Sequence, residues 1–165
     1  MVKGINLAVT KSLADFDMLL DKAIEAVSAK SLSIAYDMEK DSACKFQIGR
    51  YVQVDSDNED DEDETPLFWV GYGWDENNTH ESILWLEFDA KTCPPEYWDK
   101  IHKLTGTSGK YCSKIDIEFV QMYMNAWIHF YLGEEYLKKF YDENADQNEQ
   151  KQILTRFIEE ALEKL

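Results

Sequence analysis

Four charged residues at short spacing offer the most specific chemistry in the chain. Asp75 precedes a β-prone run, and Glu87, Asp89 and Lys91 stand at alternate positions at the end of that run. Because side chains alternate between the two faces of a strand, the last three would share one face. Two or three carboxylates there could bind Mg²⁺, and the lysine could help to stabilise a negatively charged transition state. The pattern therefore predicts a candidate metal-dependent catalytic site.

The arrangement of these residues is similar to that of the PD-(D/E)xK nucleases. In that family, one carboxylate at the end of a hairpin and a second carboxylate two residues before a lysine hold a divalent metal against a phosphate. The similarity covers about 17 residues here, from Asp75, which follows Trp instead of Pro, to Lys91. It implies a metal-dependent nuclease, or a degenerate relative of one, that uses Mg²⁺ with Asp75, Asp89 and Lys91.

The net charge of the chain opposes a nuclease function. The 165 residues include 17 Lys and Arg against 33 Asp and Glu, which gives a formal net charge of −16. Proteins that bind nucleic acid phosphates or anionic lipid over a broad surface need clustered Lys and Arg, and exposed charges repel one another within a Debye length of about 8 to 10 Å. We therefore expect no direct binding to nucleic acid or membrane. We prefer a non-enzymatic function that needs no cofactor or metal.

Half of the net charge lies in one short segment. Residues 55–64, DSDNEDDEDE, hold eight carboxylates. The segment begins like a calcium-binding EF-hand loop, but Asp60 stands where that loop requires Gly for its sharp turn. A block of like charges is typical of a solvated, mobile loop. The alternative function of the segment is electrostatic contact with a basic partner, through Asp57, Asp60, Asp61 and Asp63.

Aromatic residues fill the region that follows this segment. Phe68, Trp69, Tyr72, Trp74 and Trp85 stand in two β-prone runs, and core packing is the simplest interpretation of them. Strand alternation separates Trp69 from Tyr72 and Trp74, so that some of these rings must face away from the others. The alternative is a contact surface that includes Trp69, Tyr72 and Trp74, because Trp and Tyr often anchor interfaces.

The segment Gly106-Thr-Ser-Gly-Lys110 superficially resembles a phosphate-binding loop. That motif requires Gly at position 104 and Ser or Thr at position 111, whereas the chain has Leu104 and Tyr111. The segment is therefore predicted to be a plain turn.

The cysteines and the N-terminal residues predict a reducing compartment. The chain contains three widely spaced cysteines, Cys44, Cys93 and Cys112. An odd number at such spacing fits reduced thiols better than a disulfide framework or a zinc site. The first residues contain no apolar stretch of the length that a signal peptide requires. We therefore expect a soluble, cytoplasmic protein.

Alternation of apolar and polar residues predicts the strands. Residues 44–54 form a half-buried strand, and residues 67–74 and 82–89 form a hairpin with a longer loop. Together they suggest a three-stranded antiparallel meander. A further strand is predicted within residues 122–132, and residues 32–38 fit either a strand or a continuation of the preceding helix.

Apolar residues at spacings of three and four predict the helices. An N-terminal helix ends near Val27, and a middle helix opens at Cys93-Pro94-Pro95. The chain closes with helices over residues 134–141 and 147–165. The resulting order predicts a single α+β domain over residues 1–165, in which the antiparallel sheet is packed by these helices and an acidic loop projects at residues 55–65.

Two functional hypotheses of different classes follow. The preferred one is a non-enzymatic acidic protein that binds a basic protein partner, as an inhibitor, an immunity-like protein or a DNA-mimicking protein does. Opposite charges raise association rates, and many basic targets are nucleic-acid enzymes. The alternative is the nuclease, with Asp75, Glu87, Asp89 and Lys91 as its site.

Overall fold

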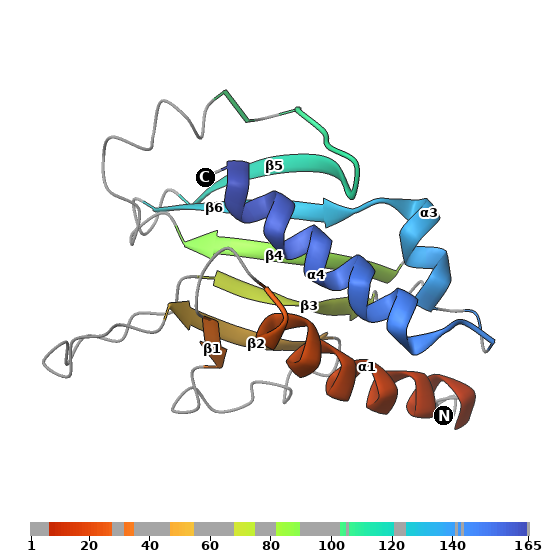
Figure 1. Ribbon diagram of the computed structural model, residues 1–165. Coiled ribbons are helices and arrows are strands. Elements are labelled where there is room, and N and C mark those ends of the chain that lie inside the picture. The colour runs from red at the N-terminus through yellow and green to blue at the C-terminus, as the bar shows by residue number, and fades with distance from the viewer. Residues whose placement is uncertain are drawn as a thin grey trace, which may run out of the picture.

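The computed structural model describes residues 7–27, 32–34, 47–54, 68–74, 82–89, 103–104, 106–120, 125–140, 142 and 144–164. These residues form an α+β structure, which is the class that the sequence predicts. Two long helices, α1 (Leu7–Glu25) and α4 (Gln147–Lys164), lie on one side of a sheet (Figure 1). None of the helices in this part of the chain is long and apolar enough to span a membrane.

The sheet is antiparallel and contains six strands among the described residues, in the order β1-β2-β3-β4-β6-β5. Strands β2, β3 and β4 follow one another in chain order, whereas β6 lies between β4 and β5. The strand bounds are β1 Leu32–Ile34, β2 Gln47–Val54, β3 Phe68–Trp74, β4 Ser82–Asp89, β5 Cys112–Val120 and β6 Asn125–Leu132.

The sheet has more strands than the four that alternation predicted. Strand β1 fits one of the two alternatives left open for residues 32–38. Strand β5 was not predicted. A register shift between Cys112 and Lys114 breaks the alternation at its start, because a bulge puts an extra residue between two core positions, here Cys112 and Ile115. In the rest of the strand the alternation is regular.

Apolar stripes on α1 and α4 pack against the inner face of the sheet to form one core. Spacings of three and four put these side chains on one side of each helix. Thr155 Oγ1 also donates a hydrogen bond to the carbonyl oxygen of Ala23 at 3.2 Å, which joins the two helices. The buried apolar residues of this core are Phe16, Leu19, Leu20, Ala23, Ile24, Val27, Val52, Phe68, Val70, Cys112, Ile115, Ile128, Phe130, Leu132, Ile153, Leu154, Phe157, Ile158 and Ala161.

Two short elements, α3 (Glu134–Leu137) and η4 (Lys138–Phe140), connect β6 to the segment before α4. With α4 they form the helices predicted at the C-terminal end of the chain. Of the middle helix predicted after Cys93, only Lys103 and Leu104 lie within the described residues, and both are helical.

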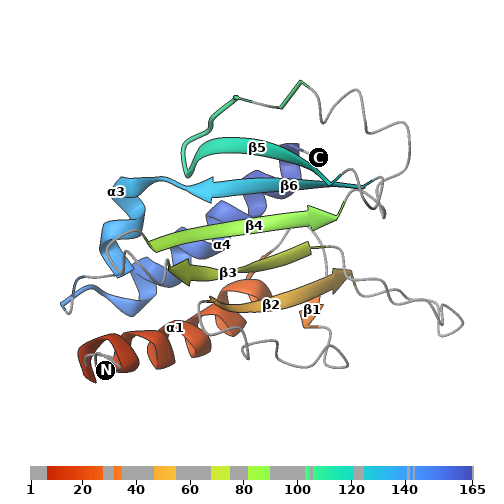
Figure 2. The same ribbon diagram turned by 180° about the vertical axis from the view of Figure 1, so that it is seen from behind.

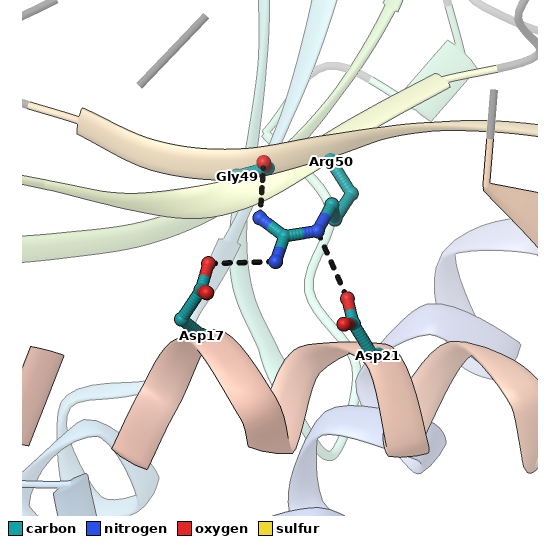
Figure 3. A network of polar contacts seen from close by, with 4 residues as sticks. All are labelled: Asp17, Asp21, Gly49 and Arg50. Atoms are coloured by element: carbon teal, nitrogen blue, oxygen red, sulfur yellow. Dashed lines mark hydrogen bonds and ion pairs between the residues drawn. The ribbon is translucent and has the colours of Figure 1, made fainter. Parts of the chain in front are cut away.

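A buried arginine joins α1 to β2 (Figure 3). Only 4% of the Arg50 side chain is exposed, and its Nη2 and Nε donate hydrogen bonds to Oδ1 of Asp17 at 2.6 Å and Oδ1 of Asp21 at 2.9 Å. Its Nη1 donates to the carbonyl oxygen of Gly49 at 3.0 Å. Asp17 and Asp21 stand one helical turn apart on α1, so that both carboxylates reach the same guanidinium.

Candidate functional site

The second face of the sheet lies opposite α1 and α4, and Figure 2 shows it in front of both helices. We call it the open face. Tyr51, Trp69, His129 and Asp116 belong to it, because their chain neighbours Val52, Phe68, Ile128 and Ile115 are buried in the core on the other side. Both long helices of the described part of the chain lie on the other face, which we call the inner face.

The register of four strand pairs aligns one row of open-face residues across the sheet. Tyr51 pairs with Trp69, Trp69 with Glu87, Glu87 with His129, and His129 with Asp116. Residues that pair on neighbouring strands have Cβ atoms about 4.5 to 5.5 Å apart. Two aromatic residues, a histidine and two acidic residues therefore form a continuous row.

Two further rows flank this one. On one side, Trp85 pairs with Tyr131, which pairs with Lys114. On the other side, Asp89 pairs with Trp127, which pairs with Glu118. Over the paired residues of β4, β6 and β5, the backbone register thus assigns four acidic positions (Glu87, Asp89, Asp116 and Glu118) and one lysine position to the open face.

The lysine of this face, Lys114, interacts with two other residues of the same face. Lys114 Nζ forms an ion pair with Oδ2 of Asp116 and lies 5.6 Å from the centroid of the Tyr131 ring. The hydrogen bond to Asp116 raises the pKa of Lys114 above its ordinary value. Because the faces of aromatic rings attract cations, the Lys114 ammonium group interacts with both Asp116 and Tyr131. By residue type, the acidic positions of these rows outnumber the lysine position.

The structure places the predicted aromatic contact residues on different faces. Trp69 is only 9% exposed, and a Cβ added to Gly49 would overlap its indole ring. Trp69 is therefore a packing residue of the open face. The register sets Tyr72 opposite Ile48 and Leu84, which alternate with the open-face residues. Tyr72 and Trp74 thus alternate with Trp69 along β3.

The acidic segment, which contains Asp57, Asp60, Asp61 and Asp63, lies outside the described residues. Its contact with a partner stays a prediction. Its points of attachment are described. It leaves β2 after Val54 and enters β3 at Phe68. Because Trp69 pairs with Glu87, these attachment points lie at the end of the sheet where β4 ends at Asp89.

The residues of the nuclease hypothesis are described only in part. Glu87 and Asp89 share one face of β4, whereas Asp75 and Lys91 lie outside the described residues. Trp74, the neighbour of Asp75, pairs with Ser82 at the opposite end of β4 from Asp89. Ser82 and Asp89 are therefore about 23 Å apart along β4. Among the described side chains, no group of three or more potential ligands could hold a metal ion.

The last residue of the segment predicted to be a plain turn and the two residues that follow it bind an anionic group of the chain itself. The backbone N–H groups of Lys110 and Tyr111 donate to Oε2 of Glu160, both at 3.0 Å, and that of Cys112 donates to Oε1 at 3.1 Å. Successive N–H groups that converge in this way form an anion-binding concavity. Here the anion is a side chain of α4, so the loop serves to attach α4 to β5.

The open-face residues of β5 and β6 are not among the residues predicted for the site, although the strand over residues 122–132 was predicted. Asp116 and Glu118 alternate with the apolar residues Ile115, Ile117 and Phe119, and this alternation was the available signal. Their proximity to β4 depends on β6 lying between the two strands, which chain order does not reveal.

Comparison of the chain with protein-family models, with curated proteins and with solved structures finds no match in any of the three.

Proposed function

We propose that the protein is a non-enzymatic acidic binding protein that receives a basic protein partner on the open face of its sheet. The observation that carries this proposal is the register of β4, β6 and β5, which gathers Glu87, Asp89, Asp116 and Glu118 among aromatic residues. Carboxylates set among aromatic rings suit Arg and Lys side chains, which combine a cationic head with an apolar stem.

The acidic segment extends this surface in the proposal. Its attachment points at Val54 and Phe68 lie at the same end of the sheet as Asp89. Its eight carboxylates would therefore attract a basic partner toward that end, and long-range attraction of this kind raises association rates. An inhibitor or a DNA-mimicking protein that covers a basic enzyme surface would use charge in this way.

The same physics argues against nucleic acid or membrane as the partner. Both are polyanions or carry anionic groups, and a face with an excess of carboxylates repels them. We place the protein in the cytoplasm, in agreement with the free thiol of Cys112.

A charge-matched comparison tests the proposal. The probe is a labelled peptide of alternating arginine and glycine, and its affinity is measured by fluorescence anisotropy at low and at moderate salt. Glu87→Gln combined with Asp116→Asn removes two charges from the open face. Glu25→Gln combined with Glu163→Gln removes two charges from exposed positions on the helices and leaves the same net charge.

The open-face variant is expected to bind the peptide about threefold to tenfold more weakly than the native chain, because each exposed ion pair contributes about 0.2 to 1 kcal/mol. The helix variant should change the affinity by much less, and added salt should weaken both interactions. Equal effects of the two variants would show that only the net charge matters, and would contradict an open-face site.

A further inference from the structure

A pocket of about 340 Å³ lies at one end of the molecule, where the start of β5, the α3 and η4 turns and the first turns of α4 meet. Figure 1 shows α3 and the beginning of α4 at this same end. The volume stands near the lower limit for small-ligand pockets. It therefore suits one small group and not a large cofactor.

Two tyrosines form an aromatic wall of the pocket. The rings of Tyr111 and Tyr136 have centroids 4.7 Å apart and planes tilted by 34°. Lys110 Nζ already lies 5.1 Å from the centroid of the Tyr111 ring. That contact fits the general attraction between a cation and the face of an aromatic ring.

The charges around the pocket leave one carboxylate uncompensated. Glu149 forms an ion pair with Lys139 at 3.1 Å, so these two charges neutralise each other. Glu135 makes no hydrogen bond or ion pair within the described part of the chain. Ile153 is buried and adds an apolar surface to the lining. The pocket thus combines an aromatic wall, an apolar surface and a free negative charge.

We infer that this pocket binds an alkylguanidinium group. A guanidinium is planar, which allows it to stack on a tyrosine ring, and its N–H groups suit a carboxylate such as that of Glu135. The alkyl stem would lie against Ile153. A free guanidinium compound and an arginine side chain of a peptide both carry this group.

Titration with N-methylguanidinium chloride, followed by backbone amide NMR shifts at constant ionic strength, tests the inference. We expect saturable shifts at Glu135, Tyr136, Gln152 and Ile153, with an affinity in the millimolar range. N-methylurea, which is neutral and has a similar shape, should leave these amides unshifted. Equal shifts with N-methylurea, or shifts that avoid the pocket, would overturn the assignment.

Glu135→Gln and Glu163→Gln provide the matched variants. Both residues are exposed, and Glu163 stands on the last turns of α4, about 15 Å along the helix from the pocket-lining part. Glu135→Gln should weaken N-methylguanidinium binding by about fivefold, since charge-assisted hydrogen bonds are stronger than neutral ones. Glu163→Gln should leave it unchanged. Equal affinities in the two variants would contradict a role for Glu135.

Two ligands show whether the guanidinium group comes from a peptide or from a free compound. Tighter binding of a capped Gly-Arg-Gly peptide than of agmatine would assign the pocket to an arginine of a protein partner, and the reverse order to a small free guanidinium compound. Failure of both to shift the pocket amides would overturn the inference. The open-face variants should bind N-methylguanidinium as tightly as the native chain does. The pocket and the proposed function can therefore be tested independently.

Discussion

Arg50 carries a positive charge at a position almost withdrawn from water, with 4% of its side chain exposed. Three of its five N–H groups donate to acceptors on Asp17, Asp21 and Gly49. A buried charge is tolerated when it is paired and hydrogen-bonded in this way. The two aspartates retain about 40% exposure, so they remain partly solvated if the arginine is removed.

We expect Arg50→Ala to lower the free energy of unfolding by about 2 to 4 kcal/mol, through loss of its hydrogen bonds and its packing. Arg50→Met, which keeps most of the side-chain volume, should lose less. Lys22→Ala, at an exposed position on α1, serves as the control and should change stability by less than about 0.5 kcal/mol. Urea unfolding measures all three. A loss in Arg50→Ala no larger than in the control would refute a stabilising role for this contact.

Burial of the Cys112 thiol predicts that the stability of the molecule depends on pH in alkaline solution. Burial raises the pKa of Cys112 above its ordinary value of 9.0. In the unfolded chain the thiol therefore ionises at a lower pH than in the folded protein. The protonated thiol therefore makes its full contribution to the free energy of unfolding below about pH 9. This contribution is lost as the pH rises toward the pKa of the thiol in the folded protein.

We accordingly expect the free energy of unfolding to fall more steeply above pH 9.0 in the native chain than in Cys112→Ala. The comparison concerns the slope against pH, because the substitution itself also removes buried atoms and lowers stability at every pH. Chemical unfolding at several pH values measures the slope. Parallel curves for the two proteins would show that the thiol does not titrate differently in the folded state.

At the scale of elements, Glu160 attaches α4 to the beginning of β5 through three backbone N–H groups. Gly109 lies so close to this contact that an added Cβ would overlap the carboxylate of Glu160. An alanine at position 109 would therefore displace the carboxylate and leave the N–H groups without their acceptor.

A double-mutant cycle tests this contact. Glu160→Ala should lower the free energy of unfolding by about 1 to 3 kcal/mol, and Gly109→Ala should also destabilise the native chain. In the Glu160→Ala background, Gly109→Ala should become almost neutral, because the carboxylate that it displaces is already absent. Glu163→Ala is the control on the same helix. Additive losses in the cycle would indicate that position 109 acts independently of Glu160.

Elements with an uninterrupted period could be predicted from the sequence. The apolar spacing that begins at Phe16 and at Ile153 identifies the inner faces of α1 and α4, because a helix repeats every 3.6 residues. The bulge after Cys112 interrupts the two-residue period at the start of β5, and the alternation that remains from Ile115 to Phe119 was not recognised as a strand. Local pattern is thus most informative where it is uninterrupted.

The candidate site depends on contacts that local pattern does not contain. Asp116 and Glu87 lie in one row only because β6 lies between their strands. The contact of Glu160 with Lys110 joins residues 50 positions apart. Such contacts follow from packing of the whole chain, and for this reason composition could reveal the excess of acidic residues without identifying which of them share one face of the sheet.

At the scale of the whole molecule, negative charge is distributed unevenly. Residues 55–64 hold eight carboxylates and account for half of the net charge of −16. Four further acidic residues share the open face, and the acidic segment is attached at the end of the sheet that carries Asp89. A basic partner approaching the molecule would therefore experience its strongest attraction at that end.

The most direct measurement is a map of backbone amide NMR shifts during titration of the full chain with the arginine-glycine peptide at low salt. We predict saturable shifts on the open-face strands, at Asp116, His129 and Tyr131, that are lost in the Glu87→Gln and Asp116→Asn variant. Residues 55–64 should not be the only residues that shift. Shifts confined to that segment or to α1 and α4, with the open-face amides unchanged, would contradict it.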